Sequence, residues 1–252
     1  MSVTKRIDSG RGHWYRLDGE KVDGVTTVIS NGIPKPALMP WAAKEVATFA
    51  ADHLDLLAEL DRDARIDLLK GAHFRDRDKA ARRGTEVHNL AEKIINGQEV
   101  EVPEELLGHV DSYLAFLDEF DPKPILVEAV VGNRTHGWMG TLDLVAEVMG
   151  EVYLMDVKTT RSGIFGEVGL QLAAYRHAEF YIDADGNEQP FPRTDHGAAI
   201  WVRADGYDVV PVESGPDIYR VFRYAQQIAQ FQTVTSKQVV GDVIQPPKGK
   251  AA

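Results

Sequence analysis

Apolar residues recur every three or four positions over several long stretches of the chain. Such spacing places the apolar side chains along one face of a helix, so it predicts helices with one buried side. The predicted helices cover residues 41–70, 72–97, a segment that begins at Pro103, 165–181 and 214–232. The second of them is expected to end at Asn96-Gly97, because glycine readily adopts the backbone conformation that terminates a helix.

Runs with the composition of β-strands lie between these helices. Residues 125–133, 139–150 and 151–160 (ILVEAVVGN, MGTLDLVAEVMG and EVYLMDVKTT) predict three consecutive strands joined by short turns. Two further hairpins are predicted, one over His13–Val28 that turns at Asp18-Gly19 and one over residues 197–212. Residues 183–195 are rich in turn formers and are expected to be a surface loop.

This order of elements predicts an α/β (α+β) fold in which a central mixed β-sheet is flanked by helices. Residues 1–71 are expected to form an N-terminal hairpin and helical elaboration, residues 72–235 a core, and residues 236–252 a flexible tail. A length of 252 residues is consistent with one domain and such elaborations.

Composition narrows the class of protein further. A hydrophobic fraction of 44% is ordinary for a globular domain, and no apolar run is long enough to cross a bilayer. The first residues lack the apolar core of a signal peptide, so a cytoplasmic location is expected, in a cell or in the host of a virus. The absence of cysteine excludes disulfides, zinc–thiolate sites and iron–sulfur clusters. A net charge of −11 argues against a protein that wraps long nucleic acids, but not against an enzyme that binds a few phosphates.

The hairpin over residues 139–160 carries the most specific chemistry. If Met149-Gly150 is its two-residue turn, Asp143 stands directly opposite Asp156 and Thr141 directly opposite Lys158. Directly opposed residues share one face of a sheet, with Cβ atoms roughly 4.5–5.5 Å apart. The two aspartates and the lysine are therefore expected to project from a common face.

Two carboxylates at that separation repel each other unless a positive charge compensates them. A hard divalent cation such as Mg²⁺ does so, since it prefers oxygen ligands from one or two carboxylates, water and substrate phosphate. The competing interpretation is an exposed ion pair between Lys158 and Asp156, which contributes little to stability. A slip of one residue in the register would also place the aspartates on opposite faces.

Several short motifs, taken in their order along the chain, resemble one family. GTLD at 140–143 and DVK at 156–158 resemble the PD-(D/E)xK nuclease signature, with leucine in place of the proline before the first aspartate. GTEVH at 84–88, VEAVV at 127–131 and QLAAY at 171–175 resemble motifs of the RecB-like branch. The segments GVTTVIS, PKPAL and WAAKEVA, within residues 24–47, are similar to the opening of phage-borne exonucleases in that branch. The resemblance covers most of residues 24–180.

The resemblance implies a restriction-endonuclease-like core that uses Mg²⁺ or Mn²⁺. It implies that the cation is held by His88, Asp143, Asp156, Glu128 and the backbone carbonyl of Val157. The catalytic groups it implies are Asp143, Asp156, Lys158, Gln171 and Tyr175. Relatives that carry an iron–sulfur cluster need four cysteines, so no such cluster is expected here.

Each of these roles has a simpler alternative. His88 shares a helical face with Thr85 and Glu92, but an isolated histidine is more often satisfied by an ordinary hydrogen bond. Glu128 is nearly as well explained as a solvent-facing strand residue. Gln171 and Tyr175 lie one helical turn apart, and the tyrosine can instead pack in the core with its hydroxyl hydrogen-bonded.

A basic run leads into the GTEVH motif. Its residues are Arg75, Arg77, Lys79, Arg82 and Arg83. With Thr85 and Arg161, the last two arginines are candidates for contacts to backbone phosphates, which position a nucleic acid without reading its sequence. The alternative is an ordinary solvated helix face.

The leading functional hypothesis is a metal-dependent DNA exonuclease, phage-encoded, that acts in recombination or repair. A structure-specific or nicking endonuclease on the same scaffold is the second, and a non-catalytic nucleic-acid-binding module is the third. The expected partners are DNA and a recombination or annealing protein, with a homo-oligomer as a further option. The residues leave open the strand polarity, the preference for single or double strands, and the use of one or two metal ions.

Overall fold

The strands of this computed structural model form two sheets rather than the single central sheet that was predicted. The structure describes residues 4–9 and 12–245, and in one long helix it does not describe the side chains of residues 75–80. The seven-stranded sheet has the order β1 (Lys5–Ser9), β2 (Gly12–Leu17), β3 (Glu20–Gly24), β6 (Trp138–Thr141), β5 (Val130–Asn133), β9 (Phe180–Ile182) and β10 (Glu188–Pro190). The five-stranded sheet has the order β12 (Gly206–Pro211), β11 (His196–Arg203), β8 (Glu151–Lys158), β7 (Leu144–Val148) and β4 (Lys123–Val127). Parallel and antiparallel pairs occur in both sheets, so the predicted α+β class with mixed strands and flanking helices is confirmed.

The helices follow the apolar spacing closely in the core and less closely near the N-terminus. Their bounds are α1 (Val25–Gly32), α2 (Leu38–Asp52), α3 (Leu54–Glu59), α4 (Arg62–Lys70), α5 (Ala72–Ile95), α6 (Leu107–Phe120), α7 (Glu167–Arg176) and α8 (Pro216–Thr233), with 3₁₀ turns at Glu104–Leu106 and Thr235–Lys237. The helix predicted over 41–70 is three helices. Asp61 explains why a separate helix, α4, begins at Arg62, because its carboxylate accepts hydrogen bonds from backbone N–H groups in the first turn of α4. The helix predicted over 165–181 ends at Arg176, because Phe180 begins strand β9.

The N-terminal hairpin is confirmed at its turn and wrong at its end. Asp18 and Gly19 both have positive φ angles, 50° and 91°, as a tight hairpin turn requires. The second strand stops at Gly24, and the residues expected to extend it to Val28 form helix α1 instead. Val25, Val28 and Ile29 have helical spacing and are buried in the main core. Strand β1, which precedes the hairpin, was not predicted.

Two of the predicted strands are each broken in the middle. Residues 125–133 divide into β4 and β5 at Glu128-Ala129, and residues 139–150 divide into β6 and β7 at Leu142-Asp143. Glu128 N–H donates to Asp143 O (2.9 Å) and Leu142 N–H donates to Ala129 O (3.0 Å), so the two breaks face each other. Both segments of the chain therefore pass from one sheet to the other, and they do so at residues that lie opposite each other.

The predicted register of the β7–β8 hairpin is confirmed over part of its length. Met149 and Gly150 form its turn with φ angles of 53° and 83°, and the ladder runs from Val148 opposite Glu151 to Leu144 opposite Met155. It stops there because β7 begins at Leu144. The expectation that Thr141 stands opposite Lys158 is wrong, since Thr141 lies beyond the break and pairs with Val130 in the other sheet.

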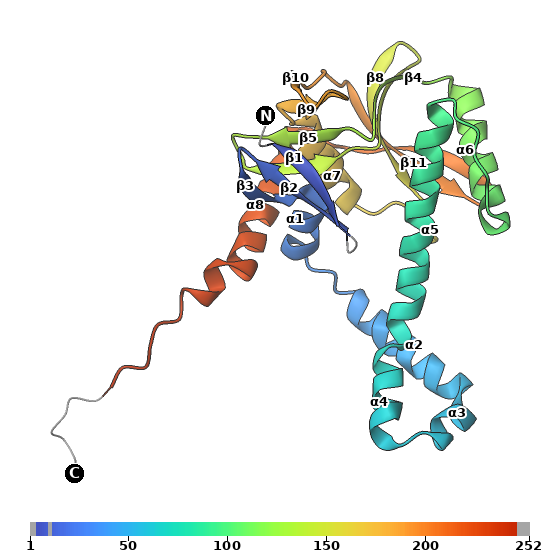
Figure 1. The fold of residues 1–252 in the computed structure, drawn as a ribbon, viewed down its shortest axis with the longest axis vertical. Coiled ribbons are helices and arrows are strands. Elements are labelled where there is room, and N and C mark those ends of the chain that lie inside the picture. The colour runs from blue at the N-terminus through green and yellow to red at the C-terminus, as the bar shows by residue number, and fades with distance from the viewer. Residues whose placement is uncertain (1–3, 10–11, 246–252) are drawn as a thin grey trace.

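Both faces of the five-stranded sheet are covered by helices. Alternation along the strands places Val145 and Leu154 in a core with α1, α7 and α8, and Ala146 and Met155 in a second core with α5 and α6. Figure 1 shows α5 and α6 beside this sheet and α7 behind the strands. Polar side chains that project from β8, α5 and α7 are therefore carried by elements that are anchored in these two cores.

The predicted N-terminal elaboration has two parts, one that packs on the sheets and one that extends away from them. Strand β3 pairs with β6 and helix α1 packs against α8, so strands β1 to β3 and helix α1 are continuous with the rest of the fold. Helices α2, α3 and α4 instead extend away from the sheets together with the first half of α5 (Figure 1). At the other end, residues 239–245 have no regular secondary structure, and residues 246–252 of the predicted tail lie outside the described residues. None of the described helices combines the length and the apolar character needed to cross a membrane.

Gly140 in β6 offers a test of how tightly this core is packed. A Cβ atom at this position would lie 2.5 Å from the ring of Tyr175, which is buried. We therefore expect Gly140→Ala to lower the free energy of unfolding by about 1–3 kcal/mol, because an overpacked core must shift. Urea or thermal unfolding measures this change. The matched control is Gly241→Ala, where an added Cβ meets no atom within 4 Å; equal effects of the two substitutions would contradict the close packing of Tyr175.

Candidate active site

The double strand break brings Glu128 and Asp143 side by side. Glu128 has a φ angle of 46°, unusual for a residue with a side chain, and its N–H donates to the Asp143 carbonyl. Helix α5 places His88 against this pair, with His88 Nδ1 3.3 Å from Asp143 Oδ2. One ligand atom from each of His88, Glu128 and Asp143 lies within 4.8 Å of the others, and no second such group was found among the described residues. Three of the predicted metal ligands are thus gathered, from three separate segments.

The Asp143 carboxylate also completes the edge of the β7–β8 ladder. Its Oδ2 atom accepts a hydrogen bond from the Val157 backbone N–H at 2.7 Å. Because β7 begins one residue later, Asp143 is not paired opposite Asp156 in the ladder, and this part of the predicted register is wrong. Val157 takes part through its N–H, and the use of its carbonyl stays a prediction.

A second group of polar side chains is built on β8 and α7. Asp156 is 2% exposed, and its Oδ2 atom contacts the Lys158 ammonium. Gln171 on α7 donates from Nε2 to Asp156 Oδ1 (2.7 Å) and accepts from Lys158 Nζ at 3.4 Å. Tyr175, one turn further along α7, is buried and interacts with Gln171 through its hydroxyl. The structure therefore brings together all four predicted catalytic residues of this segment of the chain.

Burial and mutual charge set the protonation of the metal group. Burial alone would lower the pKa of His88, but the adjacent Asp143 carboxylate outweighs it and raises that pKa to about 9. Burial raises the pKa of Glu128 to about 8, and the Asp143 charge adds to the shift. The pKa of Asp143 itself is lowered despite burial, because His88 and the Val157 N–H stabilise the carboxylate.

The neighbouring group is coupled to the first by charge. Burial raises the pKa of Asp156, and the Asp143 carboxylate raises it further although Lys158 opposes both effects. Burial opposes the charge of Lys158, but Asp156 and Asp143 raise its pKa. Three carboxyl groups therefore lie close together in a partly buried site, with one lysine and one histidine.

The donor set fits a divalent cation. A space of about 10 Å³ lies among His88, Glu128 and Asp143, which is room for roughly one water-sized particle. Two carboxyl groups and one imidazole are ligands that Mg²⁺ or Mn²⁺ accepts in an octahedral site completed by water. Asp156, the other predicted carboxylate ligand, lies beside this group with its oxygens engaged by Lys158 and Gln171.

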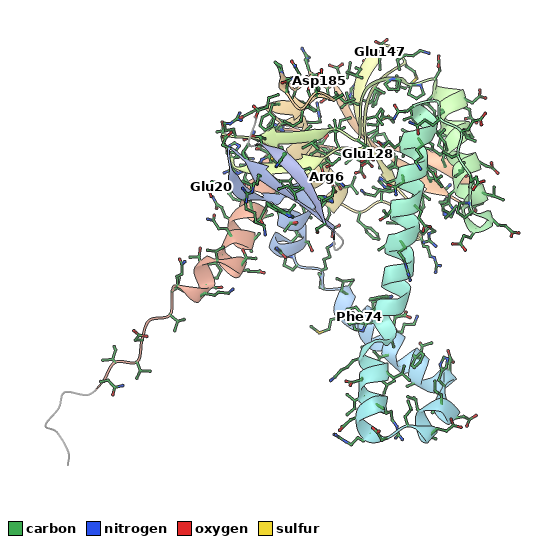
Figure 2. All side chains as sticks on the ribbon, viewed as in Figure 1. Arg6, Glu20, Phe74, Glu128, Glu147 and Asp185 are labelled. Carbon is green, nitrogen blue, oxygen red and sulfur yellow. The ribbon has the colours of Figure 1, made fainter. Side chains whose placement is uncertain are left out.

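Several residues around this space were not predicted as site residues from the sequence. Glu92 and Tyr113 line it, and helical spacing had already placed Glu92 on the face of His88. The charge of Arg6 on β1 partly opposes the rise that burial causes in the pKa of Glu128, and Arg6 donates to Thr141 Oγ1 at 3.2 Å. Figure 2 shows Arg6 and Glu128 in the middle of the body, near the junction of the sheets. No local pattern could have identified Arg6, because its strand was not predicted.

The predicted phosphate-binding residues lie in a separate cleft. Arg82, Arg83 and Arg161 line a cleft of about 530 Å³ together with His109 and two glutamates. The Nε atom of Arg83 and the Nδ1 atom of His109 are buried there without hydrogen-bond partners in the described structure. Burial, with the Arg83 charge, lowers the pKa of His109.

Other members of the predicted basic segment do not reach this cleft or cannot be placed. Thr85 is exposed, and its hydroxyl donates to the Ala81 carbonyl of its own helix at 3.1 Å. The side chains of Arg75, Arg77 and Lys79 lie outside the described residues.

Comparison with known proteins adds little to this geometry. No protein-family model matches the chain, and no curated protein is significantly similar to it in sequence. A solved structure described as "Crystal structure of SSO0001" has a TM-score of 0.31 and 14% sequence identity; the match covers 53% of this chain and 63% of that chain, less than two thirds of its length. A likeness this weak carries no argument about fold or activity.

Protons and a cation should compete for the metal group. At neutral pH both His88 and Glu128 carry a proton, because their pKa values are about 9 and about 8. A cation must displace these protons, so we expect its affinity to rise with pH between about 6 and 9 and binding to release protons. Titration calorimetry with Mn²⁺ in buffers of different ionisation enthalpy measures both quantities.

The matched control for this measurement is the exposed pair of His196 and Glu151, whose Nε2 and Oε2 atoms lie 2.6 Å apart. Asp143→Asn should weaken Mn²⁺ binding and reduce the proton release, whereas Glu151→Gln should leave both unchanged. An affinity that does not vary over this pH range would exclude His88 and Glu128 as ligands.

Proposed function

We propose that this chain is a metal-dependent nuclease that hydrolyses phosphodiester bonds in DNA, and that it acts as an exonuclease. The observation that carries the proposal is that two partly buried polar groups meet, His88–Glu128–Asp143 and Asp156–Lys158–Gln171. They meet where Asp143 Oδ2 accepts a hydrogen bond from the N–H of Val157, the residue between Asp156 and Lys158. The first group offers ligands for a cation. The second holds a lysine next to them, in the order that the nuclease motifs of the sequence suggest.

Phosphodiester hydrolysis needs an activated water, a polarised phosphoryl group and a stabilised leaving oxygen. A bound Mg²⁺ or Mn²⁺ supplies these by acting as a Lewis acid and by lowering the pKa of a bound water. Asp143 is the ionised ligand of the site, and its position is fixed by the Val157 N–H. Glu128 and His88 complete the donor set once they lose their protons.

Lys158 acts as a fixed cation beside the reacting phosphate. Its ammonium contacts Asp156 and Gln171, so its position is set before substrate binds, which is how preorganised charges stabilise a transition state. Gln171 orients the Asp156 carboxylate, and Tyr175 supports Gln171 from the core. These two residues are positioning residues rather than participants in proton transfer.

The placement of the D-x-K sequence matters more than its presence. Asp121 and Lys123 have the same spacing as Asp156 and Lys158, and their side chains also form an ion pair, at 2.6 Å. Both are largely exposed to solvent, with 77% and 65% of each side chain accessible, and the described structure places no third carboxylate or imidazole in a metal group with them. An exposed pair of this kind contributes little energy and has no reason to concentrate a cation.

The biological setting of the proposal comes from the motifs. The similarity to phage-borne exonucleases suggests a role in recombination or repair at DNA ends, with an annealing or recombination protein as a partner, in the cytoplasm of the host. Self-association into a homo-oligomer is part of the same proposal. The basic cleft of Arg82, Arg83 and Arg161 supports contact with a phosphate backbone despite the net charge of −11.

The central experiment is digestion of end-labelled DNA with Mg²⁺ or Mn²⁺. We expect Asp143→Asn, Asp156→Asn and Lys158→Ala each to lower the rate by at least about 100-fold. The first removes a ligand of the cation, the second removes the carboxylate that holds Lys158 in place, and the third removes the positive charge beside the reacting phosphate. Asp121→Asn and Lys123→Ala are matched controls and should retain full activity. Full activity in Asp156→Asn or Lys158→Ala would refute the assignment.

The same digestion separates exonuclease from endonuclease action. Linear, circular and end-blocked DNA, each single- or double-stranded and labelled at either end, are compared in parallel. An exonuclease leaves circular and blocked substrates intact and releases nucleotides from one labelled end. Cleavage of circular DNA would favour the structure-specific or nicking alternative.

The basic cleft can be tested by the salt dependence of DNA binding. Each phosphate contact removed should reduce the slope of log K against log salt concentration by roughly 0.7–0.9. We expect this change for Arg83→Ala and for Arg161→Ala, measured by fluorescence anisotropy without metal. Arg193→Ala is the control, since its side chain is 92% exposed and outside the cleft. An unchanged slope in both cleft variants would exclude the cleft from the DNA path.

A further inference from the structure

A pocket adjoins the proposed catalytic lysine, and the roles assigned so far do not use it. It measures about 240 Å³ and is lined by Lys158 and Gln171 together with residues of α1, the loop over residues 159–166 and the first turns of α7. Phe165 in this loop lines the pocket with its side chain 53% exposed. An exposed aromatic ring that lines a pocket beside Lys158 can stack on a ligand, because no other part of the described structure covers most of it.

The loop that carries Phe165 is held in place by the fold. Trp201 donates from Nε1 to the Thr160 carbonyl at 2.7 Å, and the Thr160 hydroxyl donates to the Gly163 carbonyl at 2.6 Å. Gly163 has a φ angle of 106°, which suits glycine. The Phe165 carbonyl accepts from Val168 N–H at the start of α7. The aromatic ring is therefore presented at a defined place.

The lining of the pocket combines an apolar wall with positive charge. Ile29 and Ile164 supply apolar surface beside Phe165, and Lys35 adds a second ammonium to that of Lys158. Glu167 is a carboxylate on the same wall, and Lys158 is already paired with Asp156, so Lys35 is the cation of this wall that is left to meet an anionic ligand group. Lys35 is exposed and has no ion-pair partner among the described residues. A ligand with one flat ring and an attached anion matches this lining.

The volume limits the ligand to a single ring system. Sites that enclose a whole drug-sized ligand occupy roughly 300–1,000 Å³, so a pocket of 240 Å³ is too small for the end of a duplex. A base enters such a pocket only when it is unpaired, because leaving the stack costs energy that is smallest for a single strand.

We propose that this pocket binds the unpaired base of the nucleotide next to the scissile phosphate, with Phe165 stacked on the base and Lys35 near its phosphate. The assignment rests on the proposed function in one respect, since Lys158 marks where the scissile phosphate lies. It adds a substrate class to that function, namely DNA with a single-stranded end. Stacking on an aromatic side chain accepts every base, so the pocket confers no sequence preference.

The test uses the full chain in Mg²⁺ and a single-stranded oligonucleotide with a fluorescent adenine analogue as its terminal base. A phosphorothioate linkage beside that base prevents hydrolysis during the measurement. We expect stacking to quench the fluorescence of the bound oligonucleotide. Phe165→Ala should lose the quenching and bind roughly tenfold more weakly, whereas Phe165→Tyr should restore both. Lys35→Ala should weaken binding and retain the quenching.

The matched control is Phe231→Ala on α8, which removes a residue of similar exposure, 51%, outside the pocket. It should bind and quench as the unaltered chain does. Unchanged quenching in Phe165→Ala, or no binding by the unaltered chain, overturns the subsite.

The outcome is separable from that of the digestion experiment. If the unaltered chain cleaves DNA while quenching does not depend on Phe165, the subsite is wrong and the nuclease proposal stands. If quenching depends on Phe165 but the chain cleaves no DNA, the subsite stands as a binding site and the nuclease proposal fails.

Discussion

The candidate site depends on one backbone feature, the coincident break in two neighbouring strands. An unbroken β4–β5 strand beside an unbroken β6–β7 strand would pair all their residues in one sheet. Here the Glu128 N–H and the Leu142 N–H still donate across the junction in the same register, but each strand continues in the other sheet. Glu128 adopts a positive φ angle there, a conformation that costs energy for a residue with a Cβ atom. The break frees the Asp143 side chain to meet His88 and the Val157 N–H.

Charge balance is the second constraint, and it links the two polar groups. A buried carboxylate is costly unless a cation or hydrogen bonds compensate it. Here Asp143 is compensated by His88 and Asp156 by Lys158, whereas the charges of His88 and Arg6 do not outweigh burial at Glu128, which retains a proton near neutral pH. A divalent ion would replace protons with a charge of fixed position.

The arrangement of helices and strands separates the candidate metal group from the arginine cleft and from the Phe165 pocket. Helices α5 and α7 cover opposite faces of the five-stranded sheet, and α5 contributes His88 to the candidate site whereas α7 contributes Gln171 and Tyr175. The arginine cleft and the Phe165 pocket are distinct from the small space between His88 and Asp143. A nucleic acid that used all three would contact a phosphate surface, a cation site and a base pocket in turn.

Local sequence determined the features that depend on neighbouring residues. Helical spacing identified α5 and α8, and the Asp18-Gly19 and Met149-Gly150 turns followed from residues that tolerate positive φ. The motif order also selected Asp156, Lys158 and Gln171, which the structure places in contact. Tertiary structure alone decided where the strands break, because a strand pattern is the same whether its halves pair in one sheet or two. It likewise brought Arg6 to Glu128, and Ile29 and Lys35 to the pocket of Lys158, since contacts between distant segments leave no period in the sequence.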